Sequence, residues 1–212
     1  MPLNLKTGAF FPFVKFDAKR GTWAARFGED KDETAFKHPK LVFGLDTIQT
    51  GWILFGQTGA PRLAWDVSLA VEAPRPEWGE KAKRGFRVLV VGNDPIKEAN
   101  GQKLGVRELM SNAGVTKTAI SALYDLYEQD RGKHPNALPY VHNTECEKHT
   151  GSFGAVFEPK FAILGWVPMA KLTALTDAVA ADHGVDEPPP EPEGAEDDGI
   201  PYENDDDRDI PF

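Results

Sequence analysis

The chain has 212 residues, of which 41% are hydrophobic and 27% charged, so it can form one domain with an appendage or two small domains. Its net charge of −9 is uneven: residues 182–212 hold 13 acidic residues and one basic residue, Arg208, whereas residues 1–181 hold 23 basic and 20 acidic residues. No apolar run is long enough to cross a bilayer, and no signal-peptide cleavage site follows the N-terminus. The single cysteine, Cys146, cannot form an intramolecular disulfide. These features exclude a membrane-spanning or disulfide-stabilised protein and predict a cytoplasmic one.

The body is predicted to be mainly β. Short aromatic and β-branched runs separated by Gly and Asp indicate strands, and one segment has helical periodicity. In chain order, the predicted elements are strands over 10–16, 21–27, 41–45, 52–55 and 84–91, a helix over 117–130, and strands over 139–144 and 157–167.

The predicted helix buries one face, on which Ala119, Ile120, Leu123, Leu126 and Tyr127 recur at a period of 3.6 residues. Thr116 is its expected N-cap and Gly132 its expected end. Several short strands and one late helix favour an OB-like closed β-barrel over residues 1–181, with one inserted α-helix and long loops.

A second region begins between Ala181 and Gly184. Pro188, Pro189, Pro190 and Pro192 alternate there with acidic residues, and apolar residues almost vanish. Such a segment cannot bury enough surface to offset its ordering entropy. Residues 182–212 are therefore predicted to form a disordered acidic tail.

The tail ends in an apolar tripeptide after an acidic run, Asp205-Asp206-Asp207-Arg208-Asp209-Ile210-Pro211-Phe212. This ending resembles the C-terminal tip of bacterial and phage single-stranded DNA-binding proteins, whose tails finish in acidic residues followed by Ile-Pro-Phe. The match covers about these eight residues, and Arg208 departs from it by interrupting the acidic run. The body does not match the standard bacterial barrel and is more similar to the divergent phage-encoded barrels. The resemblance implies binding of single-stranded DNA during replication, recombination and repair, in a bacterial or phage-infected cell.

The tip is predicted to bind replication or recombination proteins. A partner pocket with an apolar floor and a basic rim would capture the Phe212 ring and carboxylate, and the aspartates would steer the encounter along a basic ridge. A random tail that aids solubility is the alternative. Because the tail is strongly acidic and the body mildly basic, the tail is also expected to compete with DNA for the basic groove. The predicted partner-binding residues are Asp205, Asp206, Asp207, Asp209, Ile210, Pro211 and Phe212.

Binding of single strands without sequence preference needs aromatic rings for stacking and basic side chains for phosphates. Aromatic residues with basic neighbours, such as Trp23 and Trp78, are therefore candidates. Trp52 and Phe55 are candidates because they lie on opposite faces of one short predicted strand, so only one of them can face inward. Rings also fill barrel interiors, however, and basic runs also form solvated loops. The candidates are Trp23, Arg26, Trp52, Phe55, Trp78, Lys81, Lys83, Arg84 and Arg87.

No motif for nucleotide binding or hydrolysis is present, and no enzyme activity or cofactor is predicted. The spacing of His142, Cys146 and His149 matches no common zinc site, so no metal is predicted either. Two alternatives stay open. One is a non-enzymatic adaptor whose barrel binds protein or duplex nucleic acid, and the other is a nuclease using dispersed carboxylates such as Asp46, Asp66 and Glu72. Homo-oligomer formation is also open.

Overall fold

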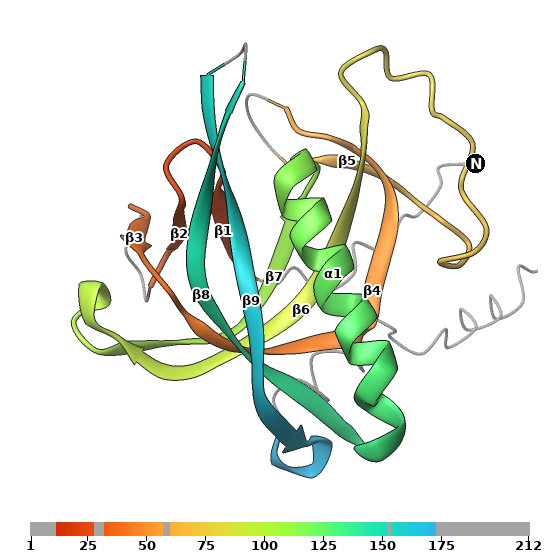
Figure 1. Cartoon of the computed structure of the whole chain (residues 1–212). Helices are drawn as coiled ribbons and strands as arrows, with labels where there is room; N and C mark the ends of the chain where they lie inside the picture. Colours follow the sequence, from red (N-terminus) through yellow and green to blue (C-terminus); the bar gives the residue numbers. More distant parts are fainter. Residues whose placement is uncertain (1–11, 28–31, 57–59, 152–153, 173–212) are drawn as a thin grey trace, which may run out of the picture.

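The computed structural model describes residues 12–27, 32–56, 60–151 and 154–172. The predicted tail and its tip lie outside the described residues. In the described part, nine strands and one α-helix confirm a mainly β body with a single helix (Figure 1). The strands are β1 (Phe13–Asp17), β2 (Thr22–Ala25), β3 (Thr34–Phe36), β4 (Lys40–Leu54), β5 (Arg62–Trp65), β6 (Lys83–Ile96), β7 (Gln102–Ser111), β8 (Ala137–Gly151) and β9 (Gly154–Pro168), and the helix is α1 (Gly114–Asp130).

The strands form one curled sheet with the order β3-β2-β1-β7-β6-β4-β8-β9, and β5 pairs with β4 off this path. All the pairings are antiparallel except that of β1 with β7. β3 and β9 end the order without pairing with each other, so the prediction of a closed barrel is wrong for the described residues. The sheet nevertheless curls far enough for the Phe157 N–H to donate to the Ala18 carbonyl, at 2.7 Å.

β4 is a single long strand where two short ones were predicted, and it bends in the middle. Its pairing with β6 is irregular between Gly44 and Gln49. The Thr47 hydroxyl bridges this break, since it donates to the Gly44 carbonyl at 2.7 Å and accepts from the Leu89 N–H at 3.2 Å. The bend divides β4 into an arm that pairs with β8 and an arm that pairs with β5.

The core lies between the inner face of the curled sheet and α1. Phe86, Val88 and Val90 alternate along β6 and are all buried on this inner face. Figure 1 shows α1 crossing the open side of the sheet. Ile120 and Leu123 pack from the helix into the same core.

The helix ends at Asp130 as predicted, but its start and its buried face differ from the prediction. It begins three residues early, with Ala113 as N-cap, and Thr116 is a fully buried residue inside it. Leu126, predicted on the buried face, is 44% exposed, because the sheet contacts a narrower stripe of the helix than the periodicity indicates. Gly132 lies in a short 3₁₀ turn, Arg131–Lys133, directly after the helix.

Candidate nucleic-acid interface

One corner of the sheet gathers most of the predicted DNA-binding residues. We define the β4–β6 corner as the last residues of β4, the strand β5, the segment 66–82 and the start of β6. The β4–β6 register places Trp52 opposite Arg84 and Ile53 opposite Lys83. Of the predicted residues, Trp52, Phe55, Trp78, Lys81, Lys83, Arg84 and Arg87 lie in this corner or at its border.

Trp52 is the central aromatic residue of the corner. It shares the inner face of the sheet with Thr50, two residues earlier in β4, and is half-buried. The guanidinium carbons of Arg75 and Arg84 lie 5.5 and 5.7 Å from its ring centre, within cation–π range. Its indole N–H donates to the Ala73 carbonyl at 3.0 Å, which fixes the ring orientation.

Asp66 holds the Arg84 guanidinium in its position at the Trp52 ring. Its side chain is 3% exposed, and it accepts hydrogen bonds from both terminal nitrogens of Arg84. These bonds hold the pKa of Asp66 well below its usual range, and bonds from the Thr50 hydroxyl and the Ala73 N–H lower it further. Both terminal nitrogens of Arg84 are therefore engaged by Asp66. We revise the role of Arg84 from phosphate contact to positioning of Trp52.

The outer face of the same strands carries a second aromatic–basic pair. The guanidinium of Arg87 lies 5.0 Å from the ring centre of Trp65. Its Nε donates to the Gln49 side chain at 2.6 Å, and its Nη1 lies 3.7 Å from the buried carboxylate of Glu108. Neither Arg84 nor Arg87 has a mostly exposed side chain, so the expectation that the whole basic run is exposed is wrong for these two residues.

Four other basic residues at the corner are exposed, and no carboxylate pairs with them within the described residues. They are Arg62, Arg75, Lys81 and Lys83. Exposed apolar side chains accompany them, with exposed fractions of 48% for Phe55, 85% for Val67, 52% for Leu69 and 53% for Val71. Half-buried Trp78 precedes the basic residues in the segment 66–82. The corner thus combines available positive charge with exposed apolar and aromatic surface.

The prediction that Trp23 offers a stacking surface is wrong. Its ring is 0% exposed, packs against Phe16 and Phe161, and donates its indole N–H to Asn143 Oδ1 at 3.0 Å. Arg26 is exposed, but it follows β2, which three strands separate from β4 in the sheet. The structure therefore separates this predicted pair from the β4–β6 corner.

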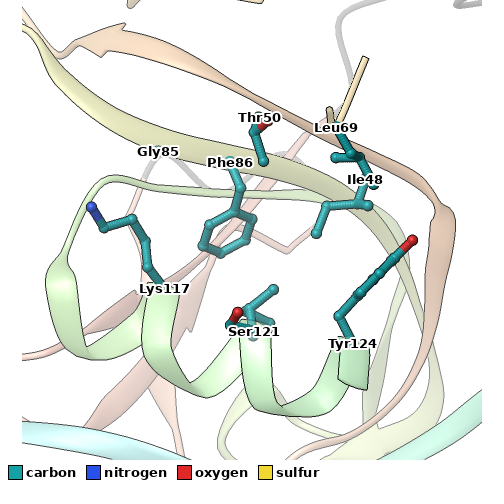
Figure 2. A pocket seen from close by; sticks show the side chains of 9 residues that line it. Ile48, Thr50, Leu69, Gly85, Phe86, Lys117, Ser121 and Tyr124 are labelled. Atoms are coloured by element: carbon teal, nitrogen blue, oxygen red, sulfur yellow. The ribbon is translucent and has the colours of Figure 1, made fainter. Parts of the chain in front are cut away.

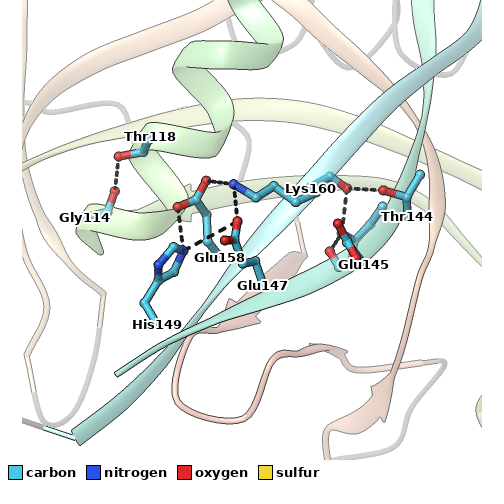
Figure 3. A network of polar contacts seen from close by, with 9 residues as sticks. Gly114, Thr118, Thr144, Glu145, Glu147, His149, Glu158 and Lys160 are labelled. Atoms are coloured by element: carbon cyan, nitrogen blue, oxygen red, sulfur yellow. Dashed lines mark hydrogen bonds and ion pairs between the residues drawn. The ribbon is translucent and has the colours of Figure 1, made fainter. Parts of the chain in front are cut away.

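The residues considered for zinc are spread along the β8–β9 hairpin. From His142 to His149, the seven residue steps of an extended strand span about 23 Å, too far for one tetrahedral site. His149 instead lies 3.2 Å from Glu158, in the network of Figure 3. Lys160 bridges Glu147 and Glu158, and these hydrogen bonds raise the pKa of Lys160. No group of three or more potential ligands holds a metal geometry in the described part of the chain.

The three carboxylates considered for a nuclease do not share one site, although two of them contact the same arginine. Asp66 is buried against Arg84, and Glu72 is an exposed neighbour of the same guanidinium, at 3.7 Å. Asp46 lines a separate cavity with Arg131 and His134 at the other end of α1.

No protein-family model, curated protein or solved structure matches this chain at a significant level. Among the described residues, no helix has the length and apolar character that a membrane span requires. Three features of the corner escaped sequence analysis: the Asp66 anchor, Arg75 and Trp65. Arg75 lies between two prolines without a periodic pattern, so its position over Trp52 had no sequence signal.

Proposed function

We propose that this protein binds single-stranded DNA without sequence preference, through the β4–β6 corner of an OB-like half-barrel. The bound strand would be protected during DNA replication, recombination or repair. The residues to which we assign binding are Trp52, Phe55, Trp78, Arg62, Arg75, Lys81 and Lys83, with Arg84 as a positioning residue. Arg87, which contacts Trp65 on the outer face, is not assigned to binding.

The observation that carries this proposal is the ring of Trp52 held in a fixed orientation beside exposed, unpaired basic side chains. Stacking on an aromatic ring is tolerant of sequence because every base has a flat face, and lysine or arginine follows the phosphates. Arg75, which touches the Trp52 ring and is itself exposed, serves both needs. Affinity for the strand should fall with salt, with a logarithmic slope of about 0.7 for each phosphate neutralised.

The acidic tail supplies the second part of the proposal. The segment Asp205–Phe212 would recruit replication or recombination proteins, and the tail would occupy the basic corner when no DNA is bound. This part rests on the sequence resemblance and on the opposite charges of tail and body.

The test is a tryptophan-fluorescence titration with oligo-dT, using the full chain and a chain that ends at Ala181, each at low and moderate salt. The proposal predicts quenching that weakens with salt and tightens when the tail is removed. Duplex DNA serves as the control and should bind more weakly. Equal affinity for duplex, or no response to oligo-dT from either chain, would refute the proposal. Unchanged affinity after truncation at low salt would refute only the competing tail.

A non-enzymatic adaptor is the second candidate, favoured by the exposed apolar side chains Phe55, Val67, Leu69 and Val71. Exposed patches of this kind mark protein-binding surfaces as well as nucleic-acid grooves. An adaptor would keep its protein partner, but would show no oligo-dT binding.

A further inference from the structure

A cavity of about 310 Å³ opens between α1 and the inner face of β4 and β6. This volume lies at the lower end of the range for small-molecule pockets, roughly 300–1,000 Å³. Phe86 and Ile120, each 3% exposed, form its floor. Figure 2 shows Tyr124 and Leu69 at one side of the cavity and Lys117 at the other. The cavity therefore has an apolar floor and an accessible rim.

The polar groups of the cavity favour a ligand with negative charge. Among the described residues, Lys117 is the only charged one that lines it, and no carboxylate does. Lys117 is half-buried and has no ion-pair partner among the described residues. It also lies near the N-terminus of α1, where the helix dipole disfavours a positive charge. Helix stability thus does not account for a lysine at this position.

The cavity is continuous with the β4–β6 corner. Thr50 lines the cavity and lies two residues from Trp52 on the same face of β4, which is about 6.8 Å along the strand. The Thr50 hydroxyl also donates to Asp66, the anchor of Arg84 beneath Trp52. A nucleic-acid strand that stacks on the Trp52 ring would therefore lie close to the mouth of the cavity.

We propose that the cavity receives one unstacked nucleobase of a bound single strand, and that Lys117 contacts the adjacent phosphate. The ligand class is a single-stranded nucleotide, so the inference rests on the proposed function and deepens it. Phe86, Ile120 and Tyr124 would contact the base. The Ser121 hydroxyl both donates and accepts hydrogen bonds, so it can pair with the edge of any base. A nucleotide fits this combination of apolar floor, hydroxyl and unpaired amine better than an apolar peptide does.

The test fills the cavity in the full-length chain. Ser121→Phe places a ring in the cavity from an exposed position, whereas Ala122→Phe adds the same ring at the next exposed residue, which does not line it. Loss of one stacked base predicts at least about fivefold weaker oligo-dT binding for Ser121→Phe. Ala122→Phe should stay within about twofold of wild type. Equal affinities of the two variants would overturn the inference.

A second variant and a direct contact measurement complete the test. Lys117→Gln should reduce the logarithmic salt slope by about 0.7, and Lys117→Arg should restore it. Photo-crosslinking with thiothymidine-containing oligo-dT should label the segment 118–131, which contains Ser121 and Tyr124. An unchanged slope, or crosslinks confined to segments that do not line the cavity, would overturn the inference while wild-type binding still supported the proposed function. If wild-type protein does not bind oligo-dT, both fail together.

Discussion

The buried pair of Asp66 and Arg84 should contribute strongly to stability, and Asp66→Asn is its sharpest test. The carboxylate accepts four hydrogen bonds, two from Arg84 and one each from the Thr50 hydroxyl and the Ala73 N–H. Asparagine keeps the shape but presents an amide NH₂ to a guanidinium that can only donate. The substitution therefore leaves a largely buried positive charge without its partner.

The size of the effect follows from burial. Removing one partner of a buried ion pair costs about 3–5 kcal/mol. The Arg84 side chain is 27% exposed, so water partly rehydrates it, and the lower end of this range, about 3 kcal/mol, is expected. For a protein of this size, that loss lowers Tm by about 6–12 °C. Urea denaturation gives the free energy of unfolding, and calorimetry gives Tm.

The same pair predicts a dependence on pH. The pKa of Asp66 is lower in the folded protein than in the unfolded chain, where it is about 3.9. Its stabilising contribution is therefore complete above about pH 5 and is lost as the pH falls below about 4, toward the folded-state pKa. The stability difference between wild type and Asp66→Asn should be constant near neutral pH and should shrink in acid.

The matched control is Glu72→Gln. Glu72 faces the same guanidinium at 3.7 Å, but its side chain is 76% exposed, so its loss should change the free energy of unfolding by less than about 0.5 kcal/mol. A loss below about 1 kcal/mol for Asp66→Asn, or an equal loss for the two variants, would refute the assignment of Asp66 as the anchor.

Three further predictions concern the core, the sheet and the corner. Asn143→Leu removes the acceptor of the buried Trp23 N–H, and urea denaturation should show a loss of about 2–4 kcal/mol. Gly85→Ala should lower stability by about 1–3 kcal/mol, because its Cβ would lie 2.5 Å from a main-chain oxygen, whereas Gly132→Ala has open space and should not. Lys83→Gln should reduce the salt slope of oligo-dT binding by about 0.7, measured by fluorescence anisotropy.

Each of these predictions has an outcome that contradicts it. Wild-type stability of Asn143→Leu would mean that the indole N–H finds another acceptor. Equal stabilities of the two alanine variants would contradict the close approach of the strands at Gly85. A salt slope identical to wild type for Lys83→Gln would remove that residue from the interface.

Periodic and strongly apolar segments of the fold were predictable from the sequence. The apolar residues Phe86, Val88 and Val90 identified β6, because their side chains all lie in the core. β7 was missed because polar residues interrupt its pattern. Arg107 is half-buried within it, and Glu108 is buried beside Arg87. Such residues are stabilised by distant partners, which a local pattern does not contain.

The candidate site was predictable only in part, for the same reason. The sequence made Trp23 and Trp52 equal candidates, Trp23 because Arg26 lies near it and Trp52 because it lies in a short predicted strand. The difference depends on Asn143, which is 120 residues from Trp23 and satisfies its indole N–H inside the core. The availability of Arg84 likewise depends on Asp66, which the strand register brings beneath it from another segment. The sequence therefore indicated which aromatic and basic residues were candidates, but it did not show which of them are buried or paired.

The most direct test of strand binding at the β4–β6 corner compares oligo-dT affinity for Trp52→Ala and Trp65→Ala. Both residues are half-buried tryptophans with arginines over their rings, but they lie on opposite faces of the same strands. We predict at least about fivefold weaker binding for Trp52→Ala and an affinity within about twofold of wild type for Trp65→Ala. Equal affinities of the two variants, or the reverse order, would contradict Trp52 as the ring on which the strand stacks.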